Sequence, residues 1–132
     1  MATIKAFTDL SQSNKLAEIL PLESADMVYT ITNGYHTPWI RIEKIDELDK
    51  DDVCAWSLTA LLDVLPNNKH ITTTLSRGGW KIEPVEYIDK WFCEYEDEVD
   101  EDSPCKAFTV SADNPIDACV AMIERLYELN LL

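Results

Sequence analysis

Nine consecutive residues in the second half of the chain are almost all acidic, and no compact fold can bury such a run. The run extends from Glu94 to Asp102, and its acids are Glu94, Glu96, Asp97, Glu98, Asp100, Glu101 and Asp102. It contains no Lys or Arg. Like charges at this density repel one another and stay hydrated, so the run must lie at the surface, where it can meet a partner. We expect it to form the tip of an overlong hairpin.

The charge of the whole chain restricts the classes of partner. The 132 residues include 25 acids and 11 bases, for a net charge of −14. This excess opposes direct binding to nucleic acid, which requires clustered Lys and Arg, and it opposes binding to anionic membranes. It permits a basic partner, including a DNA-binding protein. The hydrophobic content of 46% is typical of a globular protein, and the length predicts a single domain over residues 1–132.

The sequence predicts a cytoplasmic location. The segment Met1–Asp9 lacks the apolar core of a signal peptide. The longest uncharged apolar stretch, Cys54–Leu62, is much shorter than the ~20 residues that a membrane span requires.

Apolar residues at helical spacing predict three helices. Ser11 can cap the first helix, and the last helix has Asn114 as a cap with Pro115 at its first position. The predicted helices are Ser11–Leu20, Val53–Leu65 and a helix from Pro115 with the apolar stripe Ile116, Cys119, Val120, Ile123, Leu126 and Tyr127.

Alternating or β-branched segments predict six strands. These are Met27–Thr32, Trp39–Lys44, His70–Leu75, Trp80–Glu83, Trp91–Tyr95 and Lys106–Ser111. Asn33-Gly34 predicts a tight hairpin turn, and Arg77-Gly78-Gly79 predicts a second one. Pro38 indicates an edge strand or a strand start.

The order of these elements is α-β-β-α-β-β-β-β-α, with no repeat and no linker. Such an order favours an α+β fold. We expect one antiparallel sheet of four to six strands, with three helices packed mainly on one face.

Four segments resemble a family of short, uncharacterised proteins of phages and mobile elements in gut anaerobic bacteria. The segments are Lys5–Leu10, Leu16–Asp26, Trp56–Leu62 and Asp113–Cys119, which cover mainly the helices. The resemblance implies a phage or mobile-element context. It implies no activity, cofactor or catalytic residue.

The cysteines and histidines do not form a recognised metal or redox motif. No C-x-x-C pair occurs among the four cysteines, which are Cys54, Cys93, Cys105 and Cys119. Their spacing to His36 and His70 matches no compact zinc pattern. The acids do not fit an EF-hand loop either. We expect buried, reduced cysteines, although Cys93 and Cys105 can face each other across a hairpin and form a disulfide on oxidation. No metal or cofactor is predicted.

The sequence also lacks the signature of a nucleophilic enzyme. Such an enzyme needs Ser or Cys beside His, and the chain has two histidines and no G-x-S-x-G elbow. We therefore expect no catalytic residue. A small enzyme or ligand-binding domain remains an alternative, which predicts a deep pocket that holds a polar cluster.

These observations favour a non-catalytic accessory protein that acts through protein–protein binding. The candidate partner-binding surface consists of Trp91, Glu94, Tyr95, Glu96, Asp97, Glu98, Asp100, Glu101 and Asp102. Acids would steer a basic or DNA-binding protein, and the two aromatics would anchor it. Two alternatives are an acidic nucleic-acid mimic that inhibits a DNA-binding host protein and a solvated loop without a partner. A homodimer across the sheet is a further possibility.

Overall fold

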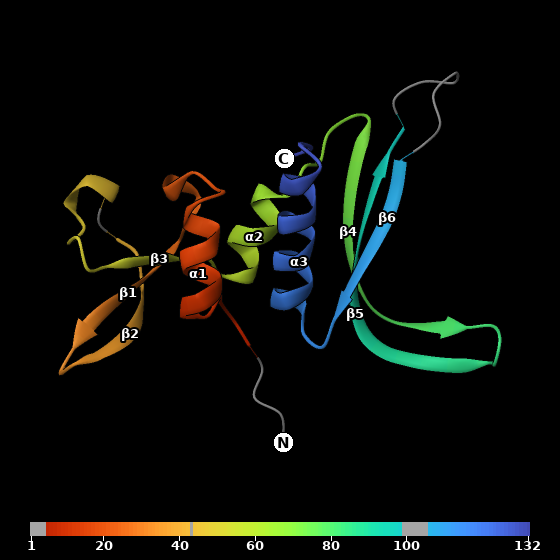
Figure 1. Ribbon diagram of the computed structural model, residues 1–132, viewed down its shortest axis with the longest axis horizontal. Coiled ribbons are helices and arrows are strands. Elements are labelled where there is room, and N and C mark those ends of the chain that lie inside the picture. Colours follow the sequence, from red (N-terminus) through yellow and green to blue (C-terminus); the bar gives the residue numbers. More distant parts are fainter. Residues whose placement is uncertain (1–4, 43, 99–105) are drawn as a thin grey trace. The chain divides into compact units, whose positions relative to one another are not determined.

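The computed structural model describes residues 5–42, 44–98 and 106–132 (Figure 1). The described chain divides into an N-terminal unit, residues 5–64, and a C-terminal unit, residues 65–132. Each unit combines helices with a three-stranded antiparallel sheet. The expected α+β class and antiparallel pairing are confirmed. The expected single sheet of four to six strands is wrong, because the strands form two separate sheets.

In the N-terminal unit, the sheet has the order β2-β1-β3 and is accompanied by two short helices. Its elements are α1 (Leu10–Ala17), β1 (Met27–Thr32), β2 (Tyr35–Ile40), β3 (Val53–Ala55) and α2 (Leu58–Val64), with 3₁₀ turns at Leu22–Ser24 and Ile45–Glu47. Asn33 and Gly34 have φ values of 51° and 82°, as the predicted tight turn requires. Pro38 lies in the edge strand β2.

Three predicted boundaries in this unit are wrong for local reasons. Asp9, and not Ser11, caps α1: its Oδ1 accepts the Gln12 N–H at 2.8 Å, and Gln12 Oε1 accepts the Asp9 N–H at 3.2 Å. The two-residue turn places the start of β2 at Tyr35, four residues before its predicted start. The predicted helix from Val53 is divided, because Cys54 pairs with Val28 in the sheet and α2 begins only at Leu58.

A buried polar network joins the elements of the N-terminal unit. Thr8 and Ser13 have no exposed surface, and their hydroxyl oxygens are 2.8 Å apart. Thr8 Oγ1 accepts the Trp56 N–H at 3.1 Å, while the Thr8 carbonyl accepts the Tyr29 hydroxyl at 2.7 Å. Each of these buried groups has a partner, so the network fixes its surroundings without an unsatisfied polar atom.

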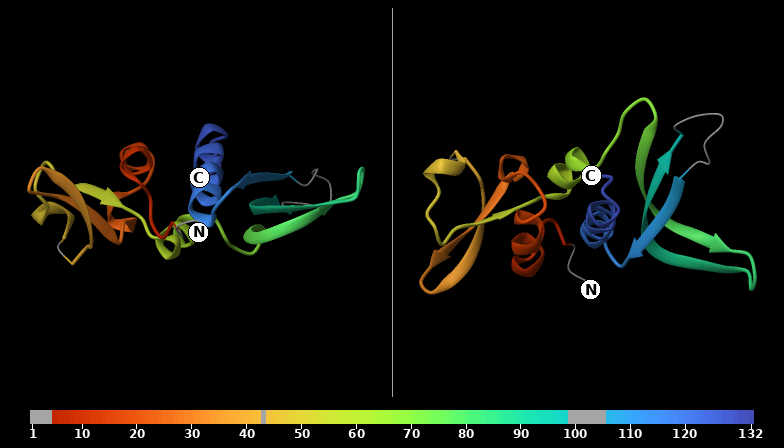
Figure 2. Two further views of the ribbon diagram at one scale, coloured as in Figure 1. Left: turned by 90° about the horizontal axis from the view of Figure 1, so that it is seen from below. Right: turned by 45° about the horizontal axis from the view of Figure 1, so that its top comes forward.

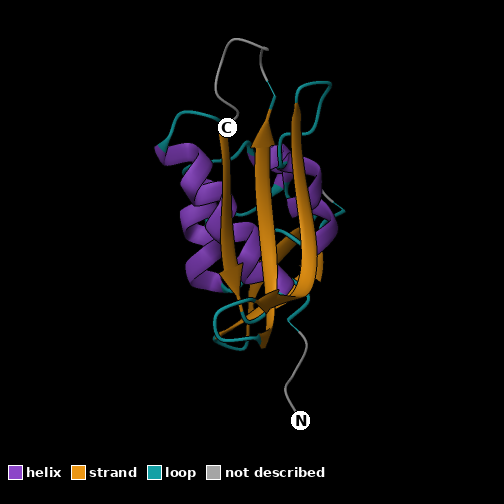
Figure 3. Ribbon diagram, turned by 90° about the vertical axis from the view of Figure 1, so that its right-hand side faces the viewer, coloured by secondary structure: helices purple, strands orange, loops and turns teal. Residues whose placement is uncertain are grey.

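The C-terminal unit consists of three strands and one helix. Its elements are β4 (Ile71–Lys81), β5 (Glu86–Asp97), β6 (Lys106–Ala112) and α3 (Pro115–Glu128). The sheet order is β4-β5-β6, and Figure 3 shows these long strands side by side. α3 packs against one face of β5 and β6.

The cap and buried face of α3 follow the sequence prediction. Asn114 Oδ1 accepts the Asp117 N–H at 2.8 Å, and Pro115 occupies the first turn. The buried residues are Ile116, Ala118, Cys119, Val120, Met122, Ile123 and Leu126. Tyr127, which was expected in the apolar stripe, is 53% exposed and lies outside this face.

The predicted turn at Arg77-Gly78-Gly79 is wrong, because β4 continues through it. Arg77 pairs with Trp91 and Gly79 pairs with Ile88, so two residues of β5 lie opposite Gly78. This mismatch is a β-bulge, at which Gly78 has a φ of 77°. The chain reverses only after Lys81. β4 and β5 therefore extend beyond the end of β6 as a two-stranded ribbon (Figure 2).

Candidate protein-binding face

The first half of the acidic run belongs to β5, where alternation separates its residues onto two faces. Cys93 and Tyr95 have no exposed surface and Asp97 is 8% exposed, whereas Glu94 and Glu96 are exposed. Successive side chains of a strand point to opposite faces of the sheet. The expected hairpin tip is thus shorter than the acidic run, since Glu94–Asp97 pair with β6.

Tyr95 and Asp97 lie on the face of β5 toward α3, so they are not part of an exposed binding surface. The Tyr95 ring stacks on Phe108 with a centroid distance of 5.0 Å, and its hydroxyl donates to Asp97 Oδ2 at 3.4 Å. Burial, reinforced by the Asp97 carboxylate, raises the pKa of Tyr95. Tyr95 was expected to anchor a partner. Because its side chain is buried inside the unit, it stabilises the fold and is not accessible to a partner.

Trp91 lies on the same face as Tyr95, at the end of the sheet, and is half-buried. The Arg77 guanidinium lies 5.9 Å from the centre of the Trp91 ring, a cation–π contact. Arg77 Nε is also 3.2 Å from Asp89 Oδ1. Trp91 is thus accessible but does not share a face with Glu94 and Glu96.

On the opposite face, the cross-strand neighbours of the two glutamates are uncharged residues. Glu94 lies between Thr74 and Thr109, and Glu96 lies between Thr72 and Ala107, in neighbouring strands. All six residues are exposed. We call this surface, together with Phe92 and Ser111, the open face. Since residues of like facing repeat at about 7 Å along a strand, the sheet holds the Cα atoms of the two glutamates at a fixed spacing.

Aromatic residues lie beside and beyond this acidic pair. Phe92 is half-buried on the open face, two residues before Glu94 in β5. Trp80 and Tyr87 pair across the ribbon and meet edge to face, with ring centroids 5.3 Å apart. They are 71% and 49% exposed. The ribbon therefore carries the accessible aromatic surface that the prediction had assigned to Tyr95.

Of the remaining acids of the predicted site, the structure describes only Glu98. Glu98 is exposed, and its N–H donates to the His70 carbonyl at 2.9 Å, which continues the β4–β5 pairing by one residue. Asp100, Glu101 and Asp102 lie outside the described residues.

Two buried cysteines meet between β5 and α3. Cys93 lies opposite Val110 in the sheet, and its thiol is hydrogen-bonded to Cys119. This bond lowers the pKa of Cys93 and, together with burial, raises the pKa of Cys119. Burial also raises the pKa of Cys54. Cys105, which the sequence indicated as able to form a disulfide with Cys93 on oxidation, lies outside the described residues.

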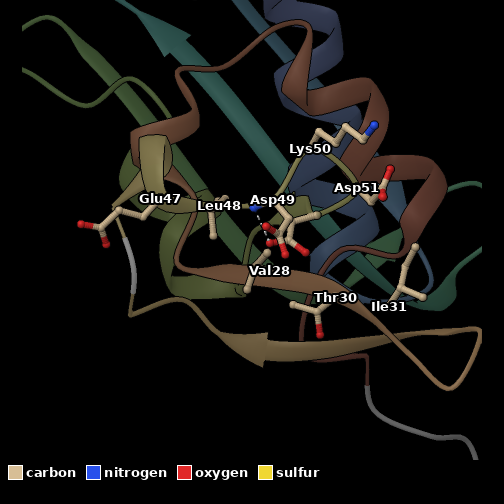
Figure 4. A pocket seen from close by; sticks show the side chains of 9 residues that line it. Val28, Thr30, Ile31, Glu47, Leu48, Asp49, Lys50 and Asp51 are labelled. Atoms are coloured by element: carbon tan, nitrogen blue, oxygen red, sulfur yellow. Dashed lines mark hydrogen bonds between the residues drawn. The ribbon is translucent and has the colours of Figure 1, made fainter.

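The N-terminal unit contains a hollow of about 560 Å³ that no sequence motif indicated (Figure 4). Val28, Thr30 and Ile31 of β1 form one side, and residues 47–52 form the other. The Asp49 N–H donates to Asp52 Oδ2 at 3.0 Å and orders that segment. Acids and Lys50 alike are among its lining residues, and the hollow is the feature on which the ligand-binding alternative rests.

A second polar cluster fixes the start of α2. The Asp26 carboxylate accepts the Ser57 N–H at 2.8 Å and also the Ser57 hydroxyl, while Ser57 Oγ accepts the Ala60 N–H at 3.3 Å. The cluster caps the helix.

His36 and His70 lie in different units, so within either unit only one histidine is available to activate a nucleophile.

Comparisons with known protein families, with curated proteins and with solved structures each gave no match. Within residues 5–42, 44–98 and 106–132, no group of three His, Cys, Asp or Glu side chains is arranged to hold a metal ion. In the same residues, no helix is long and apolar enough to cross a membrane.

Proposed function

We propose that this protein is a non-catalytic accessory protein that binds a basic partner protein through the open face of the C-terminal unit. The observation that carries the proposal is the alternation in β5. It exposes Glu94 and Glu96 on a rigid strand and buries Tyr95 between them. The strand already holds the backbone of the two glutamates in place, so binding has to order only their side chains.

Electrostatics and aromatic contacts have separate roles in this mechanism. The net charge of −14 attracts a basic partner over long range and accelerates its encounter. Glu94 and Glu96 then pair with its Lys or Arg side chains. Phe92 and the ribbon residues Trp80 and Tyr87 supply the apolar contacts that slow dissociation. Binding should therefore weaken as salt is raised, because screening reduces the charge term.

An acidic nucleic-acid mimic is the second candidate, and the spacing of the acids favours it. Glu94, Glu96 and Glu98 are exposed at alternate positions, which gives about 7 Å per step in an extended strand. Phosphates of one DNA strand rise by about 3.4 Å per nucleotide along the axis, but they also wind around it. Neighbouring phosphates are therefore farther apart than this rise, at a separation comparable to the carboxylate step. A mimic would compete with DNA for its partner, whereas an accessory protein would bind beside the DNA site.

The proposal is tested by affinity capture from a bacterial lysate with three forms of the full chain, read by mass spectrometry at low and high salt. The forms are the native protein, Glu94→Gln/Glu96→Gln, and Glu18→Gln/Asp63→Asn. The third form removes the same charge from exposed positions of the N-terminal unit. We expect a basic protein on the native and control forms that is lost from the Glu94→Gln/Glu96→Gln form and in high salt.

Two results would decide against the proposal. A partner that the Glu94→Gln/Glu96→Gln form retains does not use the open face. If the partner is lost equally from the Glu18→Gln/Asp63→Asn control, its binding depends on the net charge of the protein and not on the open face. If a partner passes both tests, competition with duplex DNA separates the mimic from the accessory protein.

A further inference from the structure

The two sheets have four edge strands, and three of them carry features that discourage pairing with another chain. Such features protect unpaired backbone groups at a sheet edge. β2 contains Pro38, and β3 has only three residues. The pairing of β4 is interrupted at Gly78 by the β5 bulge, and at the start of β4 the Ile71 N–H and carbonyl are both bonded to Asn68, at 3.1 and 2.8 Å.

The fourth edge strand, β6, has none of these features among its described residues. Its segment Ala107–Ala112 contains no charge and no proline, although the whole chain has 36 charged residues, 25 acids and 11 bases. Its pairing with β5 runs without a bulge from Lys106 to Ala112. A regular, uncharged edge strand of this length is a template for pairing with another strand.

The register identifies the backbone groups that β6 offers. The N–H of Glu98, just after β5, donates to the carbonyl of His70, just before β4. Because backbone groups alternate in direction along an antiparallel strand, the even-numbered residues in this part of β5 direct theirs toward β4. Cys93 and Tyr95 then direct theirs toward Val110 and Phe108. The N–H and carbonyl groups of Ala107, Thr109 and Ser111 therefore point away from β5. In the described chain, no backbone hydrogen bond outside the strand ladders involves these three residues.

We propose that β6 pairs antiparallel with β6 of a second copy of this chain, about a two-fold axis through Thr109. The sequence Ala107-Phe108-Thr109-Val110-Ser111 has a small residue at each end and an apolar residue on each side of the central Thr109. In this register Thr109 meets Thr109 of the second copy, Ala107 meets Ser111, and Phe108 meets Val110. Threonine pairs and aromatic–β-branched pairs are favourable across antiparallel strands. The result is one continuous sheet of six strands with isologous symmetry.

Charge repulsion gives this dimer a salt dependence opposite to that of a basic partner. Each copy carries −14, and the dimer places two pairs of Glu94 and Glu96 on one sheet. The β5 strands are separated by three strand spacings, about 14 Å, whereas the screening length at physiological salt is about 8 Å. Salt should therefore strengthen self-association and weaken binding of a basic protein, which makes the two proposals independently testable.

Sedimentation equilibrium of the full chain under reducing conditions tests the dimer, with low and high salt compared. Thr109→Lys places like charges opposite each other at the two-fold axis. Thr74→Lys is the matched control, because Thr74 and Thr109 are both exposed and both lie opposite Glu94. We expect the native and Thr74→Lys proteins to reach twice the 15.1 kDa chain mass. Thr109→Lys should raise the dimer dissociation constant by about tenfold or more.

A second measurement uses the native protein and does not depend on the folding of a variant. Amide exchange followed by NMR should show protection of Ala107, Thr109 and Ser111 that increases with protein concentration. A native chain that stays monomeric in high salt would overturn the proposal. So would a dimer that Thr109→Lys leaves intact, and a dimer lost only in Thr74→Lys would place the interface at β4.

Discussion

Burial of two tyrosine hydroxyls makes the stability of the fold sensitive to alkaline pH. Burial is the main cause that raises the pKa values of Tyr29 and Tyr95 above their ordinary 10.0. In the unfolded chain both phenols ionise near pH 10.0, while in the folded chain they keep their protons to higher pH. Their contribution is fully present below pH 10.0 and is lost as pH rises through the folded pKa values.

We therefore expect the free energy of unfolding to fall with pH above about 10. Urea titrations at several pH values measure this dependence. Tyr95→Phe should be less stable at neutral pH, because it loses the bond to Asp97, but its decline above pH 10 should be shallower. Parallel declines for native and variant proteins would show that Tyr95 does not contribute to the dependence.

Three cysteines should resist alkylation in the folded protein. Cys54 is 7% exposed, and Cys93 and Cys119 are fully buried. The hydrogen bond to Cys119 lowers the pKa of Cys93, but a reagent cannot reach the buried thiol without local opening. Mass spectrometry after maleimide treatment should find these three thiols modified only in denaturant. Rapid modification of Cys93 without denaturant would contradict the packing of α3 on β5.

Part of the arrangement of the candidate site could be predicted from the alternation of residues in β5. Strict alternation in Cys93-Glu94-Tyr95-Glu96-Asp97 already places Tyr95 on the face opposite to the glutamates. The burial of Asp97 is not evident from sequence, because burying a carboxylate is normally costly. The hollow beside β1 has no sequence signal at all, since segments 28–31 and 47–52 meet only in the folded unit.

At the scale of elements, the glycines of the two hairpins allow a matched test. Gly34 and Gly78 both have positive φ, 82° and 77°. A Cβ at Gly34 would meet nothing within 4 Å, whereas a Cβ at Gly78 would overlap the Tyr87 hydroxyl. We expect Gly34→Ala to cost about 1–2 kcal/mol, the cost of the left-handed backbone, and Gly78→Ala to cost more. Thermal unfolding measures both.

If Gly78→Ala costs no more than Gly34→Ala, the Tyr87 side chain moves away from the new Cβ at little cost, and the overlap does not destabilise the fold. The double variant Gly78→Ala/Tyr87→Ala removes the overlap. It should recover part of the loss if that contact is the cause.

Sequence patterns identified most elements and failed where tertiary pairing decided the conformation. Asn33-Gly34 and Asn114-Pro115 act locally, and both features are confirmed. Val53–Ala55 was misassigned because a short apolar run fits a buried strand or a helix equally well. Gly78 was misassigned because glycine permits a bulge as readily as a turn, and only the register with β5 distinguishes them.

At the scale of the molecule, the expectation of a single domain remains a prediction. Each unit has about half of the 132 residues, and a domain of about 60 residues buries a smaller fraction of its surface than one of about 130. We expect one unfolding transition in calorimetry, with equal calorimetric and van't Hoff enthalpies. Two transitions would show that the N-terminal and C-terminal units are independent domains.

The molecule as a whole combines a strongly negative charge with one uncharged strand segment, Ala107–Ala112 of β6, in its C-terminal unit. Charge attracts basic proteins and keeps copies apart at low salt, while the strands provide regular surfaces for contact. The open face and the β6 edge belong to the same sheet, so one unit can serve both contacts.

Mapping a captured basic partner onto the C-terminal unit by amide NMR tests the central claim most directly. The account predicts the largest shifts at Phe92, Glu94 and Glu96 and at their neighbours Thr72, Thr74 and Thr109, all of which diminish as salt is raised. Shifts confined to residues 28–31 and 47–52 would instead place the partner at the hollow of the N-terminal unit and contradict the open face as the binding site.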